Sequence, residues 1–171
     1  MVTAIPPLTE AEKLEFGNHS NNQPIDSERA KLVIASYNIR YARGPYLIPG
    51  GIARKLGLMS LARRPQHVEN LISIAAGAFT NGRLLPPVDV LALQEADKRT
   101  IRTGGHHVAC ELASQLHMNW IHAPAGIPRG IKPVKRQWWL DFEEPIGLHD
   151  EGDTGVALLS RLPMSDVTRL D

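Results

Sequence analysis

Two short apolar runs limit what this chain can fold into. Residues 32–35 and 88–94 are each too short for a buried helix, and each is followed at once by polar residues. Runs of this length and composition are typical of strands that are covered on both faces. Between them, residues 64–79 carry apolar side chains at helical spacing. A strand, helix, strand order favours parallel neighbours, so we predict an α/β fold.

The rest of the pattern adds further elements of the same kinds. A second amphipathic helix is predicted over 106–117, and short strands are predicted at 119–124 and 156–159. The segment 126–153 is dense in Pro, Gly and charge, has no clean period, and is predicted to be a long loop. Within it, the acids of 149–153 are expected to face solvent.

The domain organisation is predicted from length and local composition. The first 29 residues combine Pro, Gly and Asn with scattered charges and show no period of 2 or 3.6, so we predict a flexible leader over 1–29. The remaining residues, 30–171, are about the size of one domain. We therefore expect one domain that is preceded by a leader.

Composition excludes some classes of protein and leaves the partner open. The chain is 43% hydrophobic and 22% charged, with a net charge of +1, which is ordinary for a soluble protein. With so little net charge, no global field attracts polyanions, so nucleic acid stays open as a partner but is not favoured. The sequence shows neither a signal peptide nor a transmembrane segment. The expected location is cytoplasmic or nuclear, and the oligomeric state is left unknown.

Polar residues follow both apolar runs where the predicted strands end. Asn38 closes the first strand and Glu95 closes the second. Mg²⁺ prefers oxygen ligands, often one or two carboxylates with water and substrate phosphate completing the shell. The two side chains therefore suit a shared metal site. The alternative is that Asn38 caps a turn and Glu95 is a solvated strand end.

Three segments give the chain a family resemblance. In order, "ASYNIRYA", "VDVLALQEADKRTIRTGG" and "GDTGVALLSRLP" resemble the N-terminal signatures of the endonuclease/exonuclease/phosphatase superfamily. These Mg²⁺-dependent phosphoesterases include apurinic endonucleases, DNase I, sphingomyelinases and inositol-polyphosphate 5-phosphatases. The strand that ends in Leu-Gln-Glu is the most specific of the three segments.

The resemblance implies roles for particular residues. Asn38 matches the family Asn that orients the metal and the scissile phosphate, and Glu95 matches the Glu that binds Mg²⁺, for which Mn²⁺ is the alternative ion. The implied reaction is in-line attack by water on the phosphorus of a phosphate ester, with the metal neutralising developing charge. Apart from the resemblance, Arg99 and Arg102 lie shortly after Glu95 in the sequence, and their guanidinium groups could form paired hydrogen bonds to a substrate phosphate. A solvated loop is the alternative for both arginines.

The resemblance covers only the first part of the family pattern. The family fold is the DNase I-like four-layer α/β/β/α sandwich, and this chain is expected to supply about its first half, with the domain truncated at the C-terminus. The family's later Asp-Asn and Asp-His motifs are not matched, and no histidine here has the context of the latter. The chain is thus expected to be part of a Mg²⁺-dependent phosphoesterase or a non-catalytic truncated relative that serves as a binding or scaffold protein. Without a general base we expect negligible turnover from it alone. The substrate class, whether DNA, phosphoinositide, phospholipid or nucleotide, stays open.

Overall fold

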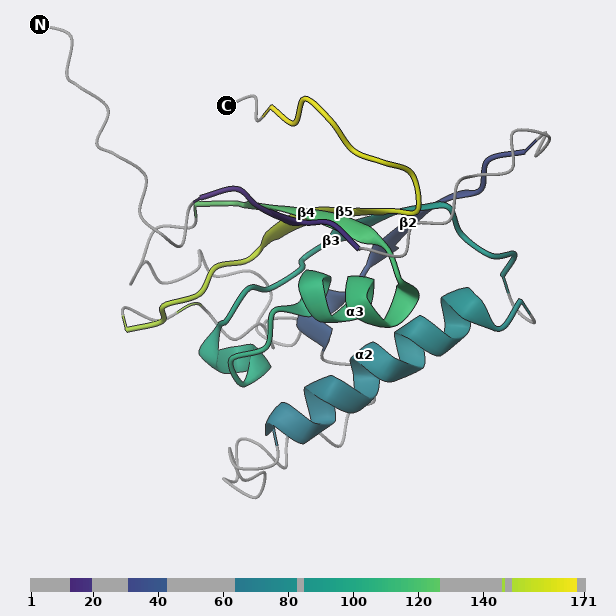
Figure 1. The fold of residues 1–171 in the computed structure, drawn as a ribbon. Helices are drawn as coiled ribbons and strands as arrows, with labels where there is room; N and C mark the ends of the chain where they lie inside the picture. The colour runs from purple at the N-terminus through teal and green to yellow at the C-terminus, as the bar shows by residue number, and fades with distance from the viewer. Residues whose placement is uncertain are drawn as a thin grey trace, which may run out of the picture.

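A computed structural model shows a five-stranded mixed β-sheet with two helices on one of its faces (Figure 1). It describes residues 13–19, 31–42, 64–82, 85–126, 146 and 149–168. The strands are β1 (Glu15–Gly17), β2 (Ile34–Asn38), β3 (Val90–Gln94), β4 (Asn119–Pro124) and β5 (Gly155–Ser160). The helices are α2 (Arg64–Thr80) and α3 (Val108–Leu116), with short 3-10 turns η2 (Arg40–Ala42) and η4 (Ile101–Thr103). The predicted α/β class is confirmed.

The strands lie in the order β1-β4-β5-β3-β2. β2 and β3 are parallel, which confirms the prediction from the strand, helix, strand order, and the other pairs are antiparallel. The parallel pair needs a crossover, and α2 lies in that connection. As a result, β2 and β3 end at the same edge of the sheet.

The core lies between the sheet and the two helices. α2 and α3 match the predicted ranges to within two residues at each end. Both bury their apolar stripes against Leu91 and Leu93 of β3 and Leu159 of β5. α3 begins after His107 because the ring Nδ1 of that residue accepts a hydrogen bond from the Cys110 amide at 3.3 Å. Such a cap satisfies one of the free donors of the first turn.

The other face of the sheet carries no helix in the described residues (Figure 1). This corrects the prediction that the first strand is covered on both faces, because Ile34 of β2 is exposed. An apolar run shows that a segment is suited to a sheet, but it does not show which face is covered or whether the strand lies at the edge. The segment after β5 turns back on this open side (Figure 1).

Part of the expected leader belongs to the sheet. Residues Glu15–Gly17 form β1, which pairs antiparallel with β4 through Glu15 with His122 and Gly17 with Trp120. The expectation of a flexible leader over 1–29 is therefore wrong for these residues. Three residues are too few to show a period, and the attachment of this strand depends on partners more than 80 positions away.

No helix formed by the described residues combines the length and the apolar character needed to cross a bilayer.

Candidate functional site

Asn38 and Glu95 meet at the carboxyl ends of β2 and β3. The parallel register pairs Asn38 with Gln94, and the Ile39 amide donates to the Gln94 carbonyl at 3.1 Å. This places the residue after Gln94 beside the Asn38 side chain. The Asn38 Nδ2 donates a hydrogen bond to Glu95 Oε1 at 2.8 Å. The two side chains that the sequence singles out are therefore in direct contact.

The orientation of the Asn38 amide follows from its second contact. The Arg40 backbone N–H, which can only donate, lies 3.0 Å from Asn38 Oδ1. The acceptor at that position must be the carbonyl oxygen, so the NH₂ group faces Glu95. Asn38 thus connects the turn after β2 to the Glu95 carboxylate. With these two contacts Asn38 positions the Glu95 side chain.

The backbone at Glu95 turns the side chain out of the strand. Its φ is 53°, in the left-handed region, which costs a residue with a Cβ roughly 1–2 kcal/mol. On one side the Ile39 amide holds the Gln94 carbonyl, and on the other the Ala96 amide donates to the Gly155 carbonyl at 3.0 Å. Neighbouring strands on both sides therefore impose this conformation. Strain held in this way is typical of functional sites.

Glu95 Oε2 is buried and has no hydrogen-bond partner among the described residues. Burying an unpaired carboxylate oxygen costs free energy unless something compensates for it. A bound cation is one such compensation. In the described residues, no group of three or more His, Cys, Asp or Glu side chains has the arrangement of a metal site. An oxygen donor of this kind suits a hard cation that keeps several waters, such as Mg²⁺, better than it suits Zn²⁺.

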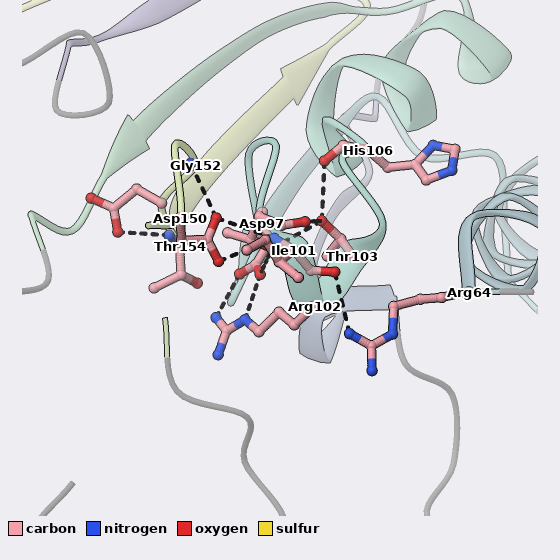
Figure 2. Close-up of polar contacts among 12 residues, drawn as sticks. Arg64, Asp97, Ile101, Arg102, Thr103, His106, Asp150, Gly152 and Thr154 are labelled. Atoms are coloured by element: carbon pink, nitrogen blue, oxygen red, sulfur yellow. Dashed lines mark hydrogen bonds and ion pairs between the residues drawn. The ribbon is translucent and has the colours of Figure 1, made fainter. Parts of the chain in front are cut away.

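The Arg102 guanidinium is engaged by Asp97. Its Nη2 donates to Asp97 Oδ1 at 2.7 Å and its Nε donates to Asp97 Oδ2, and both side chains are buried, at 7% and 0% exposure (Figure 2). Thr100 Oγ1 also donates to Asp97 Oδ2. A bidentate pair of this kind uses the face of the guanidinium that would otherwise hold a phosphate. Arg102 organises the loop after β3.

Arg99 lies towards the opposite edge of the sheet. Its side chain is 64% exposed, and its Nη2 is 4.0 Å from Glu15 Oε2 of β1. β1 is three strands away from β3, which corresponds to roughly 14 Å at the usual strand spacing. The structure therefore brings Asn38 and Glu95 together, but it does not bring the Arg99 guanidinium to them.

Sequence reasoning missed a second polar cluster, which consists of Glu15, Lys98 and His107. Lys98 is only 2% exposed, and its Nζ donates to Glu15 Oε1 at 2.9 Å. His107 Nε2 lies 3.2 Å from Glu15 Oε2. Burial, and next the nearby His122, lower the pKa of His107 to about 4. Since Glu15 lies 83 positions from Lys98 and 92 from His107, no local pattern predicts this cluster.

The acids of 149–153 do not all face solvent as expected. Asp150 is buried and accepts hydrogen bonds from the Ile101 and Gly152 amides (Figure 2). Asp153 is fully buried and accepts from the Gly126 and Thr154 amides at 3.1 and 2.8 Å. Backbone N–H groups in the adjoining loops compensate for the buried charges. These two acids hold loops together and are separate from the Glu95 carboxylate.

Comparison with family models, with curated proteins and with solved structures found no match to this chain.

Proposed function

We propose that Asn38 and Glu95 form part of a divalent-cation site for a phosphate ester, in a Mg²⁺-dependent phosphoesterase domain of the endonuclease/exonuclease/phosphatase type. The observation that carries the proposal is the 2.8 Å contact between Asn38 Nδ2 and Glu95 Oε1, beside a buried Glu95 Oε2 that lacks a partner in the described residues. An orienting amide and an available carboxylate oxygen are what a sparsely ligated Mg²⁺ site requires of the protein.

The roles of the two residues differ. Glu95 supplies the ligand oxygen, and Asn38, whose own oxygen accepts from the Arg40 amide, fixes the direction of the carboxylate. A bound Mg²⁺ would supply Lewis-acid stabilisation of the charge that develops on the phosphate oxygens. The strained backbone at Glu95 holds the carboxylate in place before any ligand arrives.

The fold that we propose for the complete arrangement is the DNase I-like four-layer sandwich. One helical layer and one sheet are described, and no helix or strand of the described residues covers the second face of the sheet. In the proposed architecture a second sheet packs on that face, about 10 Å away. Asn38 lies on the open face, so the second sheet would border the site.

A non-catalytic role is the second candidate, and the arginines favour it. Arg102 is committed to Asp97, and the Arg99 guanidinium lies near β1. The fork of Arg102 is thus already used by Asp97, and the Arg99 guanidinium lies too far from Glu95 to reach a phosphate there. A domain that binds a metal and a phosphate ester without hydrolysing the ester would need only the Asn38 and Glu95 pair.

The test is a phosphorus NMR titration with Mn²⁺ and inorganic phosphate. Phosphate that binds beside a protein-bound paramagnetic ion has a broadened resonance, so the parent should broaden it beyond the effect of free Mn²⁺. Glu95→Gln should abolish the excess broadening. The control Asp166→Asn neutralises an exposed carboxylate after β5 and should leave the excess broadening unchanged. Equal broadening by the parent and Glu95→Gln would refute the proposal.

A further inference from the structure

Two histidines from distant parts of the chain meet beside the carboxyl end of α3. His117 Nδ1 lies 3.2 Å from His19 Nε2, and the two rings meet edge to face with their centroids 5.0 Å apart. His19 follows β1 by two residues and His117 directly follows α3, so the contact joins positions 98 apart in the sequence. Neither histidine belongs to the Glu95 site or to the Glu15 cluster.

The main chain is fixed at both histidines. The His117 amide donates to two carbonyls of the last turn of α3, and its φ of 55° is the left-handed conformation with which many helices end. The His19 amide donates to Asn119 Oδ1 at 2.8 Å. Asn119 is only 1% exposed and is itself anchored, since its Nδ2 donates to the Leu162 carbonyl at 2.9 Å. Both imidazoles are therefore presented from well-anchored backbone.

The separation of the two ring nitrogens suits a shared transition-metal ion. With Zn–N bonds of about 2.0–2.1 Å, two imidazole ligands of a tetrahedral ion have their nitrogens about 3.3–3.4 Å apart, and the observed 3.2 Å is close to this value. In the pair as it stands, one of these nitrogens carries a proton and donates it to the other in a hydrogen bond. An ion takes the place of that proton, which moves to the second nitrogen of its own ring, so both rings stay neutral.

The surroundings favour a cation and leave coordination positions open. The carboxyl end of a helix carries partial negative charge, which stabilises a positive ion beside it. His117 is exposed, so water can complete the coordination shell. In the described residues no third His, Cys, Asp or Glu side chain joins the pair to make a closed structural zinc site. Imidazole ligands suit Zn²⁺, Cu²⁺ and Ni²⁺, whereas Mg²⁺ prefers oxygen.

From this geometry we propose that His19 and His117 bind a divalent transition-metal ion of the Zn²⁺ type, which fastens the segment after β1 to the end of α3. Glu15, at the start of β1, is already held by the buried Lys98. The ion holds the chain beyond the other end of this three-residue strand. It is independent of the site at Glu95, where the donors are oxygens.

The test is calorimetric titration of the full chain with Zn²⁺ in excess Mg²⁺, which occupies oxygen sites such as the one proposed at Glu95. The parent should bind Zn²⁺. His19→Gln and His117→Asn should each bind it at least about tenfold more weakly, because losing a ligand costs no less than losing a residue that orients one. Asparagine is tolerated at a left-handed helix end, so His117→Asn keeps the cap of α3. His67→Gln removes an exposed histidine of α2 and should bind Zn²⁺ as the parent does.

Thermal unfolding tests whether the ion fastens the two segments. Zn²⁺ should raise the Tm of the parent and of His67→Gln, because a ligand that binds only the folded chain stabilises it. It should leave the Tm of His117→Asn unchanged, and circular dichroism without metal checks that each variant keeps the fold. A parent that does not bind Zn²⁺, a folded His19→Gln or His117→Asn chain that binds it as tightly as the parent, an equal loss in His67→Gln, or an equal rise in Tm for His117→Asn would each overturn the proposal.

Discussion

At the scale of single residues, Glu95 combines two unfavourable features. Its backbone is in the left-handed region, and one of its carboxylate oxygens is buried without a partner in the described part of the chain. Each feature costs stability, and each is explained if the side chain is held ready for a cation. The sequence predicts the position of this residue, but neither its strain nor its unpaired oxygen.

Replacing Asn38 tests its positioning role. Asn38→Ala removes the donor to Glu95 Oε1 and the acceptor for the Arg40 amide. We expect Mg²⁺ affinity, measured by calorimetry, to fall about 10–100-fold, as is usual when a residue that orients a ligand is lost. Gln94→Ala is the control, since Gln94 bonds to Ser36 on the same face and does not contact Glu95 in the described hydrogen bonds. Unchanged affinity in Asn38→Ala would contradict the positioning role.

The backbone strain at Glu95 predicts that glycine at this position is more stabilising than alanine, the reverse of the usual order. Glu95→Gly should be about 1 kcal/mol more stable than Glu95→Ala, because only glycine adopts a φ of 53° without a Cβ penalty. The free energy of unfolding in urea measures the difference. At Gly77, within α2, the order should reverse, so that Gly77→Ala stabilises the chain by about 0.5–1 kcal/mol. If Glu95→Ala is the more stable of the pair, the backbone there is not strained.

At the scale of elements, the Glu15 cluster explains why so short a strand as β1 is held to the sheet. Lys98 projects from the loop after β3 and is almost completely buried, and Glu15 of β1 is a charged partner for it. His107, which caps α3, contacts the other oxygen of the same carboxylate. Three elements therefore meet at one carboxylate. Burial raises the pKa of Glu15, but the hydrogen bond from Lys98 and the charge of that ammonium group outweigh it, so the pKa lies below its usual value.

His107 predicts a loss of stability in mild acid. Its pKa is about 4 in the folded chain, because of burial and then of His122, although Glu15 partly opposes them. The unfolded value is about 6.5. Between these values the unfolded chain binds a proton that the folded chain does not, so stability is full above pH 6.5 and falls as the pH drops towards 4. The pKa difference corresponds to about 3 kcal/mol.

His107→Asn isolates this contribution. Asparagine does not titrate and can still accept from the Cys110 amide as the N-cap of α3. We expect urea unfolding at several pH values to show a shallower dependence between pH 4 and 6.5 for the variant than for the parent. The same slope in both proteins would assign the acid sensitivity to other groups.

At the scale of the whole molecule, periodicity and strand order predicted the α/β class, both helices and the parallel pair. These features could be predicted because the spacing of apolar residues in a helix, and the handed crossover between parallel strands, are set by short stretches of the chain. The contact between Asn38 and Glu95 follows from the same rule, since parallel strands end at one edge. Periodicity could not predict β1, the burial of Asp150 and Asp153, or the pairing of Arg102 with Asp97. Each of these depends on a tertiary contact, and the two residues in such a contact are not separated by a regular helix or strand spacing.

Calorimetric titration of the full chain with Mg²⁺ tests the central claim most directly, because it asks whether the carboxylate held by Asn38 is a ligand. The parent should bind one Mg²⁺, and Glu95→Gln, which keeps the size of the side chain but removes its charge, should bind it at least about tenfold more weakly. Equal affinity in the two proteins would contradict the assignment of Glu95 as a metal ligand, and with it the proposed phosphoesterase site.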